Sequence, residues 1–457
     1  MRRHPARARP QLSQRSPTPG EAALWEETIG FSKENRPIIS TWRGRPLAPL
    51  RVLILAGQHG DEGPALQTLQ AILDTPAGEI ESRLPGTRVA AILHSNPDGC
   101  ALRSRYNADG IDMNRDHQLL RSGETIAIHR FARRWRPHVI LDLHSYPSRR
   151  RHLLARNVVL DHDVFIDVPS HPAILARPGC ADVAAVLRSL LGAISARDVR
   201  AARYTLVASS GRARHSTPDV VDARNGLALR CTAFTILIEN RQPRREETAR
   251  ERLRLQASQE RALWAVLAWL DRNPGLFTAS SALATPSPGW PVPVHFNYTD
   301  AKHGLRLFCL DARRGQPARV TLPRYSNALS IRVAVPLPAA YAVPRTLKAL
   351  MALLRRHGFI SAPRPAEDMC SVEKLRIEQA HPSRRPGRPA RQLHLSAHAM
   401  RLSLNGYEIF PTRQTGGDAL AVFLEPESKH GLHRFDMLQI PLLAPSWYPV
   451  LRISPPF

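Results

Sequence analysis

A histidine and a glutamate stand three positions apart at the point where an apolar stretch of the sequence ends. His59 and Glu62 follow the run 51–57, which has the length of a buried strand, and the pattern at 64–74 predicts a helix directly after them. Catalytic zinc sites take their protein ligands from His, Asp and Glu side chains. This stretch therefore predicts one half of a metal site at the carboxyl end of a strand.

Three other apolar runs predict strands, and predicted helices lie between or after them. The strands are expected at 89–94, 139–144 and 234–239, and the helices at 123–135, 181–195 and 246–272. This alternation predicts an α/β domain with a mixed, largely parallel central sheet that is flanked by helices. In such sheets the functional site lies outside the carboxyl ends of the strands.

Two of these runs supply what a catalytic metal site still needs. His144 ends one run, and Glu239 ends another. A catalytic zinc ion takes three protein ligands and leaves a position for water, whose pKa it lowers towards neutrality. We therefore expect His59, Glu62 and His144 to bind one zinc ion per chain. Glu239 is the carboxylate expected to accept the proton of that water as a general base.

The rest of the chain predicts a second, smaller domain that is β-rich α+β. Composition divides the chain into a basic, disordered tail at 1–22, a catalytic domain at 23–272, a Pro-rich linker at 273–293 and a C-terminal domain at 294–457. In the C-terminal domain, strands are expected at 305–310, 318–322, 330–335, 392–395 and 419–424, and a helix at 344–357.

The chain is strongly basic, with a formal net charge of +25 and a pI near 11.1. Only 5 of its 64 basic residues are Lys, and the Arg residues are spread along the whole sequence, so no specific nucleic-acid partner is expected. No apolar run approaches the roughly 20 residues that a membrane helix needs. No secretory signal is visible, and we expect a cytoplasmic protein without a membrane partner. Five widely separated cysteines, none in a Cys-x-x-Cys pair, indicate reduced thiols.

Five motifs in a fixed order carry a resemblance to a known family. They are His59-Gly-Asp-Glu62, Asn96-Pro-Asp-Gly99, Arg105-Tyr-Asn-Ala-Asp-Gly-Ile-Asp112-Met-Asn114-Arg115, Leu143-His144-Ser-Tyr146 and Ile236-Leu-Ile-Glu239. With them the chain resembles a zinc metallocarboxypeptidase of the carboxypeptidase A-like family, in its bacterial branch with a C-terminal extension domain. The resemblance covers about residues 30–272.

The resemblance implies roles for residues of the third motif, and it assigns the ligand and general-base roles to the four residues named above. Arg105 would stabilise the oxyanion of the tetrahedral transition state, a role for which Arg103 is the alternative. Asn114 and Arg115 would bind the terminal carboxylate of the substrate. Asp112 would orient the first histidine ligand.

The activity that the resemblance implies is hydrolysis of the C-terminal amide bond of a peptide with a free carboxylate. Two departures from the family's pattern bear on the substrate. No Tyr stands in 205–225, where well-known members carry a mobile one, although Tyr204 lies just before this segment. Asp61 stands where the animal digestive enzymes have a basic residue. The patterns His-Gly-x-Glu and Asp-x-Asn-Arg are shared with aspartoacylase-like deacylases. The alternative is therefore a zinc deacylase or amidase that acts on small N-acyl amino acids or murein peptide fragments.

Overall fold

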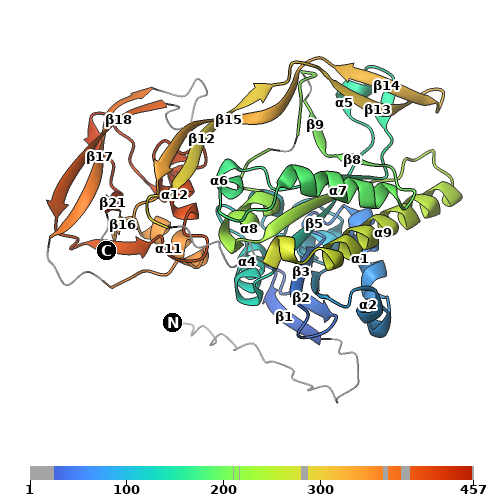
Figure 1. Cartoon of the computed structure of the whole chain (residues 1–457), viewed down its shortest axis with the longest axis horizontal. Coiled ribbons are helices and arrows are strands. Elements are labelled where there is room, and N and C mark those ends of the chain that lie inside the picture. The colour runs from blue at the N-terminus through green and yellow to red at the C-terminus, as the bar shows by residue number, and fades with distance from the viewer. Residues whose placement is uncertain are drawn as a thin grey trace.

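The computed structural model describes residues 25–208, 210–215, 217–278, 287–363, 369–381 and 392–454. The tail expected at 1–22 lies outside these residues, as does the part 279–286 of the expected linker. The described chain is built around one large sheet, with three smaller sheets beside it (Figure 1).

The large sheet has eight strands in the order β1-β2-β4-β3-β5-β11-β7-β8. Their bounds are β1 (Trp25–Phe31), β2 (Pro37–Arg43), β3 (Leu50–Leu55), β4 (Thr87–Ile92), β5 (Val139–Tyr146), β7 (Val164–Asp167), β8 (Ala201–Arg203) and β11 (Phe234–Arg241). The four central strands β4, β3, β5 and β11 run parallel. The pairs β1–β2, β2–β4 and β7–β11 are antiparallel, whereas β7 and β8 are parallel to each other. The predicted α/β fold with a mixed, largely parallel sheet is confirmed.

Helices cover both faces of this sheet, and strand residues alternate between the two. One face packs against α1 (Gly63–Leu73), α7 (Val183–Ser195) and α9 (Ala249–Arg272), and the other packs against α4 (Gly123–Trp135) and α8 (Ala223–Cys231). Val52 and Ile54 of β3 belong to the first core, whereas Leu53 and Leu55 belong to the second. Because this strand is buried on both faces from Val52 on, its sequence is apolar from Val52 to Leu55.

Most of the expected helices are confirmed, and α9 shows what sets their ends. This helix begins at Ala249 rather than at 246, because Thr248 accepts a hydrogen bond from the Glu251 N–H while the Glu251 side chain accepts one from the Thr248 N–H. Shorter helical segments, not expected from the sequence, are α2 (Ala77–Arg83), α3 (Pro97–Leu102), η1 (Met113–Arg115), α5 (Arg151–Leu154) and α6 (Pro172–Leu175).

The C-terminal part is β-rich α+β, as predicted, with one correction. It contains β16 (Ala340–Pro344), α11 (Lys348–Arg356), β17 (Cys370–His381), β18 (Gln392–Leu402), β19 (Tyr407–Pro411), α12 (Ala419–Leu424), η2 (Leu432–Arg434), η3 (Asp436–Leu438), β20 (Ser446–Trp447) and β21 (Leu451–Ile453). The strand expected at 419–424 is wrong, because this segment is the helix α12. All six of its residues are buried, so the helical period leaves no polar position in the sequence, and a short apolar run fits a strand equally well.

Long strands connect the two parts of the molecule. β12 (Pro291–Asp300) and β15 (Tyr325–Pro336) pair with each other and extend from the C-terminal part across the top of the view in Figure 1. There β15 pairs with β10 (Ala213–His215), which in turn pairs with β9 (Thr205–Val207). Likewise, β13 (Leu305–Asp311) pairs with β14 (Pro317–Leu322) and with β6 (Val158–Leu160). Two sheets therefore combine strands from both sides of the expected linker.

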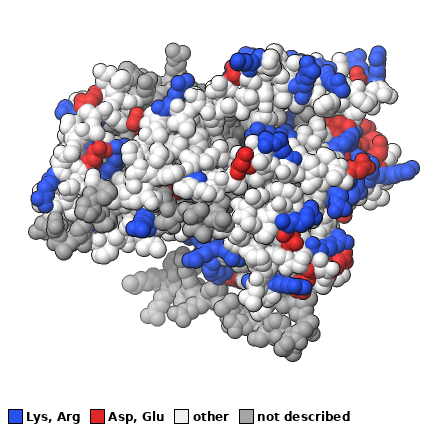
Figure 2. Space-filling model, viewed as in Figure 1, with Lys and Arg blue, Asp and Glu red and all other residues white. Residues whose placement is uncertain are grey.

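The surface carries its positive charge in scattered places. Figure 2 shows Lys and Arg distributed over the visible face among neutral residues, with Asp and Glu beside many of them. Ion pairs such as those of Arg200 with Asp163 and of Arg134 with Glu27 place acidic groups next to this charge. Within the described part of the chain, no helix is both long enough and apolar enough to cross a membrane.

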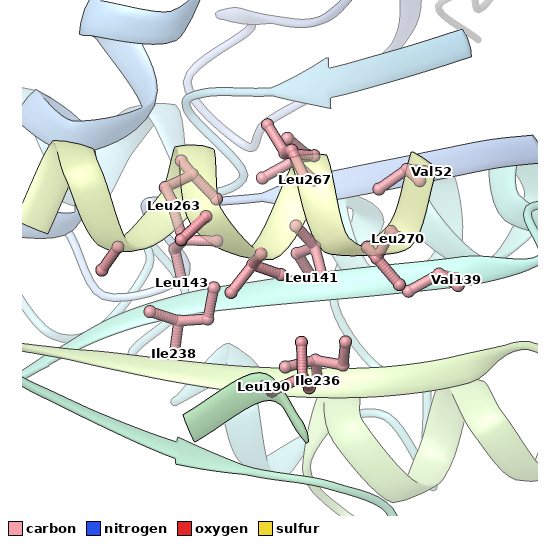
Figure 3. Close-up of a cluster of buried hydrophobic side chains, with 14 of the residues drawn as sticks. Val52, Val139, Leu141, Leu143, Leu190, Ile236, Ile238, Leu263, Leu267 and Leu270 are labelled. Carbon is pink, nitrogen blue, oxygen red and sulfur yellow. The ribbon is translucent and has the colours of Figure 1, made fainter. Parts of the chain in front are cut away.

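The core between α9 and the sheet generates a stability prediction. Leu267 of α9 is fully buried and belongs to the cluster of hydrophobic side chains drawn in Figure 3, which also contains residues of β5 and β11. We expect Leu267→Ala to lower the free energy of unfolding by about 2–5 kcal/mol, because it removes apolar contacts and leaves a cavity. Leu253 lies on the same helix but is 67% exposed, so Leu253→Ala is the matched control and should change stability by less than about 0.5 kcal/mol. Urea denaturation of both variants measures the difference, and equal effects would contradict the assigned packing.

Candidate metal centre and active site

The turn after β3 places His59 at the carboxyl edge of the sheet. Gly60 lies against Gly99, so closely that a Cβ atom on Gly60 would come within 2.0 Å of the Gly99 carbonyl carbon. The Asn96 side chain donates a hydrogen bond to the Gln58 carbonyl oxygen at 3.3 Å and accepts one from the Gly99 N–H at 2.8 Å. The Asn-Pro-Asp-Gly motif therefore braces this turn, and only glycine fits at position 60.

Three buried side chains converge at this edge, as the sequence predicts. One nitrogen or oxygen atom from each of His59, Glu62 and His144 lies within 4.8 Å of the others. The two carboxylate oxygens of Glu62 lie 2.7 Å from His59 Nδ1 and 2.9 Å from His144 Nδ1. Glu62 Oε2 also accepts a hydrogen bond from the Ser145 N–H at 2.8 Å. Residues more than 80 positions apart in the sequence thus present their donor atoms to one point.

Asp112, which the resemblance expects to orient the first histidine, lies in contact with it. Its Oδ1 lies 3.0 Å from His59 Nε2, and its Oδ2 accepts two hydrogen bonds from the Arg105 guanidinium at 2.8 and 3.0 Å. Burial by itself would raise the pKa of Asp112, but the contacts with His59 and Arg105 lower that pKa well below its usual range. The carboxylate therefore stays ionised and fixes the ring with Nδ1 directed at the site.

A second buried aspartate holds the other histidine, and the sequence reasoning missed it. Asp142 Oδ1 lies 3.2 Å from His144 Nε2, and the Asp142 residue is 1% exposed. For His144 Nδ1 to offer a lone pair, Nε2 must carry the proton, and Asp142 is the acceptor that favours this tautomer. The signal was present, because residues two positions apart in a strand share one face of the sheet.

Glu239 lies beside the three converging side chains because β11 and β5 pair in parallel. In their register Glu239 stands opposite His144. Burial, followed by the nearby charge of Glu62, raises the pKa of Glu239 to about 7. Burial, together with the nearby Glu239 carboxylate, raises the pKa of the Tyr204 hydroxyl, and Arg150 lies close enough to lower it. Neither Tyr204 nor Arg150 was identified from the sequence as a site residue, because the loops that carry them lie outside the family's motifs.

Of the two candidate arginines, Arg105 is the one at the site. Its Nη1 lies 3.4 Å from His59 Nδ1, and its guanidinium also contacts Asp112. Arg103 ends α3 in a left-handed conformation, with φ of 50°, and is exposed. Arg105 therefore has a guanidinium group next to the converging donor atoms.

Asn114 and Arg115 reach the same region in different ways. Asn114 is buried; its Nδ2 lies 3.0 Å from His144 Nε2, and its Oδ1 accepts a hydrogen bond from the Ala223 N–H at 2.8 Å. The Asn114 side chain thus also braces the start of α8. Arg115 is exposed and donates a hydrogen bond to the Asn114 carbonyl oxygen at 2.6 Å. Its guanidinium faces solvent, and the carboxylate-binding role of both residues stays a prediction.

The donor set fits a divalent metal ion. Two imidazole nitrogens and one carboxylate are the ligands that catalytic metal sites use, and the second nitrogen of each ring faces a carboxylate, Asp112 or Asp142. The two imidazoles and the Glu62 carboxylate are buried, and further carboxylates lie close to them, so several of these groups share a small volume. A bound cation would compensate this concentration of negative charge.

Metal content tests the ligand assignment. We expect Glu62→Ala to lose bound divalent metal after dialysis, because the carboxylate lies between both histidine ligands. Asp61→Ala is the matched control, since Asp61 is the exposed neighbour of Glu62 and should keep the wild-type metal content. Elemental analysis of the purified variants measures the ratio of metal to protein. Retention of a full equivalent of metal by Glu62→Ala would show that the site is elsewhere.

Comparisons with known proteins agree with this chemistry. No protein-family model matches the chain. Murein peptide amidase A of Escherichia coli (strain K12) is 38% identical over 103 residues, which are 22% of this chain and 39% of that protein. The probable carboxypeptidase 2 of Trichophyton verrucosum (strain HKI 0517) is 30% identical over 117 residues, which are 25% of this chain and 23% of that protein. The chain therefore spans about two fifths of the amidase.

Solved structures with a similar fold include two proteins of these kinds. A metallo-carboxypeptidase from Pseudomonas aeruginosa, in complex with (2-guanidinoethylmercapto)succinic acid, has 20% identity and a TM-score of 0.43, covering 55% of this chain and 65% of its own. The murein-tripeptide amidase from Escherichia coli O157 has 21% identity and a TM-score of 0.33, covering 53% of this chain and 94% of its own. Over the matched residues, the chain is thus similar both to a murein peptide amidase and to carboxypeptidases, in agreement with the resemblance seen in the motifs.

Proposed function

We propose that this protein is a zinc-dependent hydrolase of the metallocarboxypeptidase type, which cleaves the C-terminal amide bond of a peptide with a free carboxylate. The observation that carries the proposal is the convergence of His59, Glu62 and His144 next to the buried carboxylate of Glu239. The carboxypeptidase and amidase relatives support hydrolysis of an amide bond in a peptide.

Zinc is the ion that this donor set favours, and it would be held by the two Nδ1 atoms and the Glu62 carboxylate. When bound there, it would lower the pKa of a water molecule and polarise the carbonyl of the scissile amide. Glu239 accepts the proton of that water and returns it to the leaving amine. Its pKa of about 7 suits both steps near neutral pH. Tyr204 lies close enough to Glu239 for the two groups to interact, and in this proposal its hydroxyl is the donor that would restrict the direction of the carboxylate.

Two arginines have different tasks in this proposal. Arg105 is held by Asp112 with its Nη1 next to the ligand His59, where a guanidinium stabilises negative charge on the oxygen of the attacked carbonyl. Arg115 is exposed at the same edge, where its planar charged group suits a substrate carboxylate. Asn114 supports Arg115 through its backbone carbonyl oxygen.

A second candidate function is an amidase that acts on murein peptide fragments or small N-acyl amino acids. The specific observation in its favour is that the amidase relative is 38% identical, against 30% for the carboxypeptidase. A panel of substrates separates the candidates: N-blocked dipeptides, N-acyl amino acids and murein-type peptides with D-residues, each with the zinc-loaded protein. The class with the highest kcat/KM identifies the function.

The role of Glu239 generates a kinetic prediction. We expect Glu239→Gln to lower kcat by roughly 10²–10⁴-fold, because the amide cannot accept a proton, while one zinc per chain is retained. Tyr204→Phe is the companion variant. It keeps the carboxylate and removes only its hydrogen-bond donor, so its loss of kcat should be smaller. Normal turnover by Glu239→Gln would overturn the assigned mechanism.

The role of Arg115 generates a prediction about substrate binding. We expect Arg115→Ala to raise KM by roughly 10–100-fold for a peptide with a free carboxylate, since a charge-assisted hydrogen bond contributes about 1.5–3 kcal/mol. The same peptide as its C-terminal amide should show no such difference between wild type and variant. Arg103→Ala, which removes another exposed arginine nearby, is the control and should leave KM unchanged. Equal kinetics for wild type and Arg115→Ala on the free carboxylate would contradict the assignment.

A further inference from the structure

A chain of buried polar side chains lies behind the ligand His144. Gln58 donates a hydrogen bond through Nε2 to Asp142 Oδ1 at 2.6 Å, and Asp142 Oδ1 lies 3.2 Å from His144 Nε2. At its other end, Gln58 Oε1 lies 2.8 Å from His117 Nε2. Gln58 and His117 are fully buried. A direct series of contacts therefore joins His117 to the ligand through two intermediate side chains.

The chemistry of this series fixes which atom donates at each contact. Asp142 can only accept when ionised, so the amide nitrogen of Gln58 faces it and the amide oxygen faces His117. His117 must then donate from Nε2, and a neutral imidazole accepts at its other nitrogen. His129 Nε2 lies 3.0 Å from His117 Nδ1 and is placed to donate there. Burial lowers the pKa of His117 to about 4, which keeps the ring neutral near neutral pH.

This polarity gives His117 a specific effect on the site. If His117 Nε2 carried no hydrogen, the Gln58 amide oxygen would have no donor at this contact. The amide group could then rotate, so that its oxygen instead of its nitrogen faced Asp142. Two acceptors would then meet at 2.6 Å, and Asp142 would move away from His144. The tautomer and direction of the His144 ring depend on Asp142.

The C-terminal part of the molecule holds the backbone that carries His117. The neighbouring residue, Gln118, accepts a hydrogen bond at its carbonyl oxygen from His357 Nε2 at 2.9 Å, and its side chain donates to the His430 carbonyl oxygen at 2.5 Å. His357 directly follows α11, and its ring also packs edge-on against His129 with the ring centroids 5.7 Å apart. Residues of the C-terminal part therefore form hydrogen bonds with both the backbone and the side chain of Gln118.

We propose that His117 is a positioning residue for the metal ligand His144, acting through Gln58 and Asp142, and that the C-terminal part of the chain holds His117 in place. This gives the C-terminal part a role in metal affinity that is separate from substrate binding. The inference rests on the proposed function only in requiring that a metal ion is bound by His59, Glu62 and His144.

The test measures zinc affinity rather than activity. Metal-free full-length protein and its His117→Phe variant are titrated with Zn²⁺ against a competing chelator, and the melting temperature of each metal-free protein is recorded in parallel. We expect His117→Phe to raise the Kd for zinc by roughly 10–100-fold, the range typical of lost partners behind a metal ligand. His117→Gln can keep an N–H near the position of Nε2, so it should restore most of the affinity.

His171→Phe is the matched control. His171 is also fully buried and contacts the C-terminal part, with its Nε2 3.2 Å from His430 Nδ1, but it does not belong to the series that ends at His144. We expect its melting temperature to fall while its Kd for zinc stays within about two-fold of wild type, as expected for a change that only affects stability. His357→Phe, which removes the donor to Gln118, should weaken zinc binding in the same direction as His117→Phe.

The outcomes separate this inference from the proposed function. A wild-type Kd in His117→Phe, or an equal loss in His171→Phe, would overturn the positioning role, and a wild-type Kd in His357→Phe would overturn the part assigned to the C-terminal region. Should His117→Phe not fold, His117→Asn replaces it, because the shorter amide cannot reach Gln58. If wild type binds zinc but hydrolyses no peptide, the proposed function fails while these affinities still decide the inference.

Discussion

The carboxylate of Glu62 is the group on which the rest of the site depends. Each of its two oxygens faces a different imidazole, one from the turn after β3 and one from the end of β5. This geometry requires that β3 and β5 are neighbours and run in the same direction, with the last residue of β3, Leu55, paired with Asp142 of β5. The parallel pairing of β5 with β11 then adds Glu239 at the same height. The strand pairing in the buried sheet therefore sets the distances between site residues that are far apart in the sequence.

The second constraint on the site is that so many polar groups are buried together. A buried carboxylate or imidazole is costly unless it has hydrogen-bond partners. Asp112 meets this requirement with Arg105 and His59, and Asp142 meets it with Gln58 and His144. The side chains around the ligands thus serve two purposes at once. They satisfy buried groups, and they fix the rings that present Nδ1.

The sequence predicts those parts of this structure whose signals are local. The four central strands are mostly apolar, and polar residues stand towards the ends of β5 and β11, so both the α/β fold and the positions of His144 and Glu239 could be inferred. Tyr204 and Arg150 were missed, because their importance comes from what they contact and not from the residues next to them. Asp142 was missed although its position two residues before His144 in β5 offered a local signal. The segment 419–424 was assigned to the wrong element, since complete burial removes the periodicity that separates a helix from a strand. The long-range pairs of β13 and β15 have no local signal at all.

The pairing of these late strands has a consequence for how the chain is made. β6 ends at Leu160, and Cys309, the residue that pairs with it, comes almost 150 residues later in the chain. In the same way, Ala213 of β10 pairs with Tyr325 of the later strand β15. At ordinary rates of protein synthesis, the earlier strands leave the ribosome on the order of 10 s before their partners do. During that interval, the edges of β6 and β10 expose unpaired backbone groups to other chains. The order of strands thus leaves these two strand edges in the first half of the chain without their partners until the second half has been synthesised.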